Sequence, residues 1–278
     1  MLESWNNFFS PGFNPGELRG QNVGVYVGTS GVEPFNNSIS NSHSPDGFFA
    51  LNGMVNMLAN RVSYAFDFRG PSIVVDTACS SSLVCLQLAN DAIASGQCDS
   101  AIVAGANLLC DPKTTSVLNS LTLLSPDGAC KSFSEAANGY VRSETVAAIY
   151  LCRSREARRI YARVLCAKTN SDGFKEQGIT HPSIKSQVDL YSEACRLAGV
   201  EPSDVAFIEM HGTGTAVNEV NEVAALDAVF CSGDTRDMKP LLVGSVKSNV
   251  GHAEAASGKL LYFHFPQCAQ KQFGSHDV

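Results

Sequence analysis

Residues 72–96 read SIVVDTACSSSLVCLQLANDAIASG, and this stretch decides the fold. Its first four residues are an apolar run typical of a buried strand, and the apolar spacing from Leu83 to Ile93 predicts a helix that ends at Gly96. Cys79 therefore lies where a strand turns into a helix. The first backbone N–H groups of a helix lack intrahelical partners and the helix dipole favours negative charge there, so we expect the thiol of Cys79 to ionise more readily than a free thiol. This is the setting of a nucleophilic cysteine.

The composition predicts a folded chain without nucleic-acid or membrane partners. The chain has 278 residues, of which 44% are hydrophobic and 17% charged, and its net charge is −7. A sizeable core is therefore expected, and the absence of a basic patch argues against nucleic acid. No apolar run approaches the ~18 residues that a membrane-spanning helix requires, and the first residues lack the basic and apolar stretches of a signal peptide.

The ten cysteines indicate a reducing compartment. None belongs to a Cys-x-x-Cys pair, which argues against a zinc site or a thioredoxin-like site. Most lie within apolar segments, where a free cysteine behaves as a small core residue. We therefore expect a cytoplasmic protein without a bound metal ion.

The chain alternates between short apolar strands and helical segments. Such alternation predicts βαβ units and a largely parallel, buried sheet, and hence an α/β fold. The predicted strands cover residues 23–28, 73–76, 101–106, 143–153, 163–168, 205–209 and 241–244, with a helix as the alternative for 143–153. The predicted helices cover residues 51–66, 83–95, 184–198 and 219–230.

Two histidines follow predicted strands. His211 belongs to the run EMHGTGT of residues 209–215, and His252 ends the run KSNVGH of residues 247–252. Loops at strand ends are the usual place for function in an open α/β sheet, and the glycines beside these histidines let a ligand approach the backbone closely. Both histidines are therefore candidates for a site shared with Cys79.

The three segments together resemble the condensing enzymes, or β-ketoacyl synthases, of the thiolase superfamily. The signature of that family has DTACSS, HGTGT and KSN-x-GH in this order, and all three occur here at residues 76–81, 211–215 and 247–252. Three motifs in order form a highly specific signal. The resemblance implies a thiolase-like, layered αβαβα core of two pseudo-equivalent halves.

The resemblance covers residues 2–258 approximately, so we expect a partial ketosynthase core over 1–258 and a divergent tail over 259–278. The first half would run from about 1 to 155 and the second from about 156 to 258. Within the family, the stretches 66–72, 139–144 and 170–178 resemble the animal-type fatty acid synthases. A polyketide synthase ketosynthase is the alternative enzyme, and a remnant that only binds acyl groups or a partner subunit is the alternative of another class.

The resemblance also implies the reaction. Cys79 would take an acyl group from an acyl carrier protein, and a decarboxylative Claisen condensation with malonyl-carrier protein would follow. His211 and His252 would donate their Nε2–H groups to the enolate oxygen. No metal or redox cofactor is needed, because the substrates are carried on the phosphopantetheine of the carrier protein. Such enzymes are usually homodimers.

Four further residues receive supporting roles from the resemblance. Lys247 would orient the site and bias its electrostatics, and Glu254 would pair with Lys247. The hydroxyls of Thr213 and Thr215 would meet the phosphopantetheine arm.

The chain departs from the family at three motif positions and at both ends. Asn218 replaces a glycine, and asparagine tolerates the left-handed backbone expected of a turn there. Glu219 replaces an aspartate and is one methylene longer, and Thr145 replaces a glycine at a position where a β-branched residue could add strain. The family's first core strand and the Gly-Phe-Gly-Gly loop that completes its oxyanion hole have no counterpart, and one lost oxyanion donor costs ~10²–10³ in rate. We therefore expect the isolated chain to be unstable or weakly active.

Overall fold

The computed structural model describes residues 12–31, 51, 53–231 and 240–258. The chain divides into two compact units. Unit 1 consists of the described residues of Met1–Thr115, Ser143–Arg163 and Ala253–Val278, and unit 2 consists of those of Ser116–Arg142 and Val164–His252.

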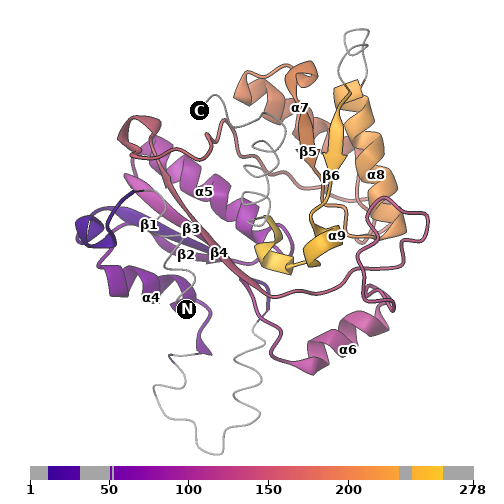
Figure 1. Ribbon diagram of the computed structural model, residues 1–278, viewed down its shortest axis with the longest axis horizontal. Helices are drawn as coiled ribbons and strands as arrows, with labels where there is room; N and C mark the ends of the chain where they lie inside the picture. Colours follow the sequence, from indigo (N-terminus) through magenta and orange to yellow (C-terminus); the bar gives the residue numbers. More distant parts are fainter. Residues whose placement is uncertain (1–11, 32–50, 52, 232–239, 259–278) are drawn as a thin grey trace, which may run out of the picture. The chain divides into compact units, whose positions relative to one another are not determined.

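Unit 1 contains the four strands β1 (Val23–Gly28), β2 (Ser72–Val75), β3 (Ser100–Asn107) and β4 (Thr145–Cys152). They form one sheet in the order β2-β1-β3-β4 (Figure 1). β1 is parallel to both β2 and β3, whereas β4 is antiparallel to β3. The predicted parallel sheet is thus confirmed, with one antiparallel edge strand added to it.

Helices cover both faces of this sheet. They are α4 (Met57–Phe66) and α5 (Ser81–Ser95). Alternate residues of β1 point to opposite faces. Val25 on one face packs in a buried cluster with Ala59 of α4. On the other face a side chain at Gly28 would lie 2.7 Å from the backbone nitrogen of Ser82, so the close approach of α5 requires this glycine.

The ends of the helices follow the sequence signals. α5 ends at Gly96, which adopts the left-handed backbone with φ 79°, as predicted. α4 begins at Met57 rather than at residue 51. Unit 1 also contains the short elements η1 (Pro15–Leu18), η2 (Ser154–Glu156) and η6 (Glu254–Ala256), and α6 (Pro112–Ser120) begins in unit 1 and ends in unit 2.

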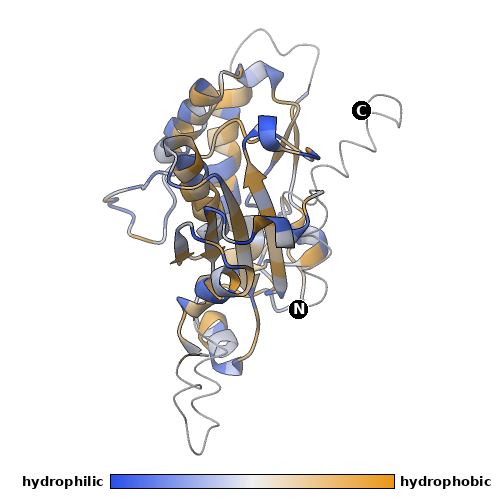
Figure 2. Ribbon diagram, turned by 90° about the vertical axis from the view of Figure 1, so that its left-hand side faces the viewer, coloured by the Kyte–Doolittle hydropathy of each residue, from blue (hydrophilic) through white to orange (hydrophobic). Residues whose placement is uncertain are grey.

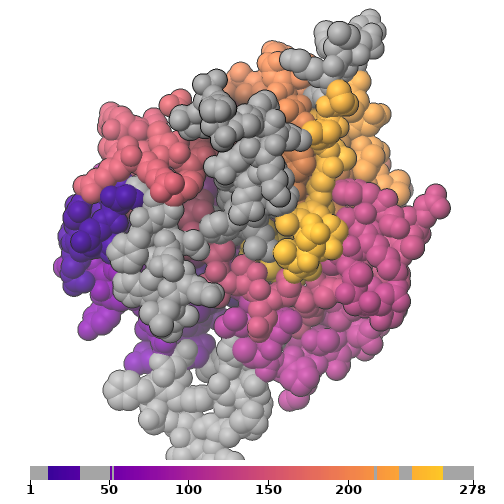
Figure 3. Space-filling view, viewed as in Figure 1, coloured from indigo at the N-terminus to yellow at the C-terminus, as the bar shows by residue number. Residues whose placement is uncertain are grey.

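Unit 2 is built on the parallel strand pair β5 (Phe207–Glu209) and β6 (Leu242–Gly244). Leu242 and Val243 of β6 are exposed, and the yellow atoms of residues 240–258 reach the surface in Figure 3. The helical elements are α7 (Ile184–Ala198), η3 (Pro202–Asp204), α8 (Ala216–Leu226), the π-helical turn η4 (Asp227–Cys231) and α9 (Lys247–Val250).

The helices of unit 2 close a small core. Met210, Leu226 and Phe230 are buried together, and Tyr191 of α7 packs against them with its ring 5.9 Å from that of Phe230. Helices of both units carry apolar and polar residues side by side along their length (Figure 2), which is typical of helices that bury one face. α7 begins at Ile184 and ends at Ala198, as predicted.

The strand predicted over residues 163–168 is wrong. In the described part of the chain this segment is not assigned to any strand. Its apolar residues suit a strand, but a strand is defined by hydrogen bonds to a neighbour and local sequence does not supply that neighbour. The helix predicted over 219–230 begins earlier, at Ala216, and its last turn widens into a π-helix.

None of the helices among the described residues combines the length and the apolar character that crossing a bilayer demands.

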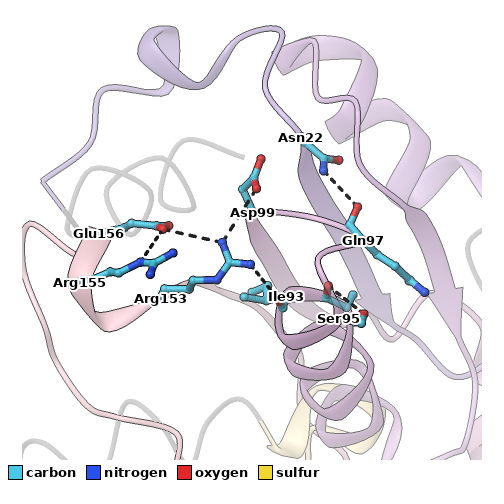
Figure 4. A network of polar contacts seen from close by, with 9 residues as sticks. Asn22, Ile93, Ser95, Gln97, Asp99, Arg153, Arg155 and Glu156 are labelled. Atoms are coloured by element: carbon cyan, nitrogen blue, oxygen red, sulfur yellow. Dashed lines mark hydrogen bonds and ion pairs between the residues drawn. The ribbon is translucent and has the colours of Figure 1, made fainter.

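Arg153 joins the end of β4 to the C-terminus of α5 (Figure 4). Its Nη2 donates a hydrogen bond to the carbonyl oxygen of Ile93 at 2.9 Å. Its Nη1 lies 3.7 Å from the carboxylate of Glu156 and 4.0 Å from that of Asp99. A positive charge at a helix C-terminus also interacts favourably with the helix dipole. Arg153 thus fixes the end of the helix that follows Cys79.

Replacing Arg153 by methionine is expected to lower the free energy of unfolding by about 1 kcal/mol, because a charge-assisted bond to the helix end is lost from a partly exposed site. Urea unfolding followed by circular dichroism measures this change. Arg155→Met is the matched control, since Arg155 is 77% exposed and its guanidinium pairs with Glu156 at the surface. Equal stability of the two variants would contradict the assigned role.

Candidate active site

Cys79 lies in the tight connection between β2 and α5, as the sequence predicted. The residue before it, Ala78, has φ 53°, which is a strained value for a residue with a side chain. Several hydrogen bonds hold this turn. Among them, Ala78 N–H donates to Asp76 Oδ1 at 3.1 Å, Thr77 N–H donates to Ser81 Oγ at 2.8 Å, and Ser81 Oγ donates to the Ala78 oxygen at 2.7 Å. The turn therefore presents a half-buried thiol from a fixed backbone.

The two predicted histidines lie side by side in unit 2. Their ring centroids are 5.4 Å apart and the rings are nearly perpendicular. His252 is buried, its backbone N–H donates to the oxygen of Val141 at 2.7 Å, and the ring of Tyr140 meets its ring edge to face at 5.0 Å. His211 is more exposed than His252. The structure thus brings together two residues that lie 41 positions apart in the chain.

Both imidazoles are held in the neutral form. Surrounding protein atoms, and then the positive charge of Lys247, lower the pKa of His211 to about 4. Burial lowers the pKa of His252 to about 2, and His211 and Lys247 add to this effect. A neutral imidazole keeps one N–H donor, which is the form needed to stabilise an oxyanion.

Glu222 positions the loop of His211. From α8, its two carboxylate oxygens accept the backbone N–H of His211 at 2.6 Å and that of Gly212 at 3.1 Å. Burial raises the pKa of Glu222, and these two donors act in the opposite direction. None of the three sequence motifs includes Glu222, so they assigned it no role.

Gly212 is required at its place in this loop. Its φ is 42°, and a side chain there would lie 2.8 Å from the Cβ of Ser245 and 3.1 Å from the ring of Phe133. Phe133 therefore packs beside the histidine loop. Nothing in the local sequence marks this lone phenylalanine as part of a site.

Glu219 joins two loops from a buried position. Its Oε1 accepts the N–H of Gly214 at 2.6 Å and its Oε2 accepts the N–H of Phe133 at 2.7 Å. The replacement of the family's aspartate by Glu219 is thus accommodated, because the longer carboxylate reaches both donors.

The prediction of a left-handed turn at Asn218 is wrong, because Asn218 lies within α8. Thr145 has an ordinary extended conformation at the start of β4, so the strain considered there is absent.

The other predicted residues fall in both units. Lys247 is buried in unit 2 at the start of α9. Thr213 and Thr215 place their hydroxyl oxygens 3.3 Å apart. Glu254 begins η6 in unit 1, the unit that also contains Cys79. Pairing of Glu254 with Lys247 and contact of the threonines with a phosphopantetheine arm stay predictions.

Comparison with family models gives two matches that together cover most of the chain. The N-terminal domain of β-ketoacyl synthases matches residues 1–157, and the C-terminal domain matches residues 161–272. The second match continues beyond residue 258, into the stretch where the motifs gave no resemblance.

Relatives include both fatty acid and polyketide synthases. The fatty acid synthase of Anser anser anser is 45% identical over 93% of this chain and 73% of its own length. The probable polyketide synthase 1 of Dictyostelium discoideum is 37% identical over 91% of this chain, which corresponds to 9% of that protein.

A solved structure has the same fold. The ketosynthase from module 6 of the bacillaene synthase of Bacillus subtilis 168 superimposes with a TM-score of 0.85 at 33% identity. The match covers 97% of this chain and 46% of that one, so the chain spans less than half of this relative. This confirms the predicted thiolase-like α/β fold.

Glu219→Ala is expected to lower the free energy of unfolding by about 2–4 kcal/mol, because two backbone N–H groups lose their acceptor in a buried place. Chemical denaturation measures it. Glu193→Ala on α7 is the control, since Glu193 pairs with Arg196 at the surface and such pairs contribute about 0–1 kcal/mol. A loss no larger than that of the control would show that the two loops do not depend on Glu219.

Lys247→Met is expected to raise the pKa of both His211 and His252, because a nearby positive charge is removed. NMR titration of labelled histidines measures the two pKa values, with Lys185→Met on the exposed face of α7 as control.

In the unmodified chain the lowered pKa values mean that the folded state binds fewer protons than the unfolded state between pH 6.5 and about 4. Stability should therefore decline as the pH falls through that window, and unchanged titration curves in Lys247→Met would contradict the electrostatic role.

Proposed function

The chain belongs to the β-ketoacyl synthase family, and from this premise we propose that Cys79, His211 and His252 form the Cys-His-His site of a condensing enzyme. The observation that carries the proposal is the pair of adjacent, neutral histidines beside the buried Lys247. Two adjacent neutral imidazoles can each supply an N–H donor to an enolate oxygen, which develops negative charge during decarboxylation.

The first step of the proposed reaction is acyl transfer. The thiolate of Cys79 attacks the carbonyl carbon of an acyl thioester, a new C–S bond forms, and the carrier leaves as a thiol after protonation. One thioester replaces another, so the exchange needs no redox partner. The hydrogen-bonded turn around Ala78 contributes by fixing the backbone from which the Cys79 side chain projects.

The second step is decarboxylation and condensation. The bond between the carboxylate and Cα of a malonyl thioester breaks and carbon dioxide leaves, while His211 and His252 donate hydrogen bonds to the enolate oxygen. The carbanion then attacks the acyl carbon on Cys79. The C–S bond breaks, the electron pair returns to the sulfur, and a 3-oxoacyl thioester is released.

The substrates follow from the same proposal. Acyl and malonyl groups would arrive on the phosphopantetheine of an acyl carrier protein, with Thr213 and Thr215 along its arm and without a metal or redox cofactor. A homodimer in the cytoplasm is the proposed state of the intact enzyme. The 45% identity to a fatty acid synthase over most of that protein supports fatty acid biosynthesis, and polyketide synthesis is the alternative.

The test uses the full 278-residue chain, a radiolabelled acetyl thioester and a malonyl thioester. Label is expected on the unmodified chain and none on Cys79→Ala, because the sulfur is the acyl acceptor. His211→Ala and His252→Ala are each expected to slow release of carbon dioxide by about 10²–10³-fold. His181→Ala changes an exposed histidine in the unit that contains His211 and His252, and it should leave both acyl labelling and carbon dioxide release unchanged.

An unmodified chain that takes no label would contradict the proposal and favour a protein that binds acyl groups or a partner without reacting.

The preference for one acyl group over another separates fatty acid synthesis from polyketide synthesis. Saturated, unbranched acyl thioesters are expected to be the better substrates of a fatty acid synthase, and a preference for oxygenated or branched chains would support the polyketide alternative.

A further inference from the structure

We propose that Glu209 is a positioning residue, which sets the loop that leads to His252 against the strand that leads to His211. This rests on the proposed function of the two histidines. Glu209 is the last residue of β5, and His211 follows two residues later. Its partner in the parallel register is Gly244, the last residue of β6, from which the chain runs on to α9 and His252.

The contact that carries the proposal is one short hydrogen bond across the two strand ends. Oε1 of Glu209 accepts the backbone N–H of Val246 at 2.6 Å. Val246 precedes the first residue of α9 and has no side-chain oxygen that could cap this helix. The carboxylate therefore holds the start of the segment that contains Lys247 and ends at His252.

Two weaker links run between the same strand ends. Met210 N–H donates to the oxygen of Gly244 at 2.8 Å, and Ser245 Oγ donates to the oxygen of His211 at 3.4 Å. Neither link reaches beyond Ser245. Glu209 is thus the side chain that extends the connection to the residue next to Lys247.

The second oxygen of Glu209 sets this carboxylate apart from Glu219 and Glu222, which use both oxygens. Within the described residues, Oε2 of Glu209 is buried and has no hydrogen-bond partner. It lies 3.9 Å from the place that a side chain on Gly244 would occupy. A single acceptor is all that Val246 requires, so glutamine, whose carbonyl oxygen can accept the same bond, is the natural conservative replacement.

The experiment compares two partial reactions in the full chain. Glu209→Leu is expected to slow decarboxylation of a malonyl thioester at least tenfold, because small displacements of catalytic groups are costly, while acylation of Cys79 changes less than about threefold. Glu209→Gln should restore decarboxylation to within about threefold of the unmodified rate. Glu176→Leu, an exposed glutamate of the same unit, is the matched control.

A second measurement is independent of activity. In a chain with ¹⁵N-labelled histidine, Glu209→Leu should shift the imidazole resonances of both His211 and His252, and Glu209→Gln should return them. If Glu209→Leu does not fold, Glu209→Asp tests the same point, because a shorter side chain withdraws the carboxylate from Val246.

Three results would overturn the inference: equal slowing of both partial reactions by Glu209→Leu, unchanged imidazole resonances in that variant, or no rescue by Glu209→Gln. An unmodified chain that neither takes acyl label nor releases carbon dioxide would instead contradict the proposed function, and the imidazole resonances would still test the positioning role.

Discussion

Backbone N–H groups in the loops that follow a strand need acceptors, and in unit 2 buried and half-buried glutamates supply them around the histidine loops. Glu222 accepts from two consecutive residues of the loop of His211, and Glu219 links that loop to the segment of Phe133. Burial of carboxylates is unfavourable unless donors satisfy them. Here the donors are the main chain itself, so each carboxylate is stabilised by the loop that it orders.

The neutral form of the two histidines has a separate origin. The protein packed around the rings disfavours their charged forms, and Lys247 adds a positive charge to the same region. The glutamates therefore position the loops, while burial and Lys247 set the protonation state of the rings.

The sequence predicted much of the scaffold and part of the site. The ends of α5 and α7 followed from Gly96 and Gly199, since a helix that runs into a left-handed glycine stops there. The strand predicted over 163–168 failed because pairing is decided by a neighbour and not by local apolar residues. Cys79, His211 and His252 could be named from their motifs, whereas Phe133 could not, because its role depends on a contact with Gly212 across 79 positions of chain.

By itself the sequence determined the family, the chemical groups and their order along the chain, because motif identity is a local property. Tertiary structure decided which carboxylate holds which loop. Glu209, Glu219 and Glu222 look alike in the sequence, yet they differ in donors and in the number of oxygens used. That difference arises from where β5, β6 and α8 place the N–H groups of distant residues, and hydrogen bonds over such separations exist only once the chain has packed.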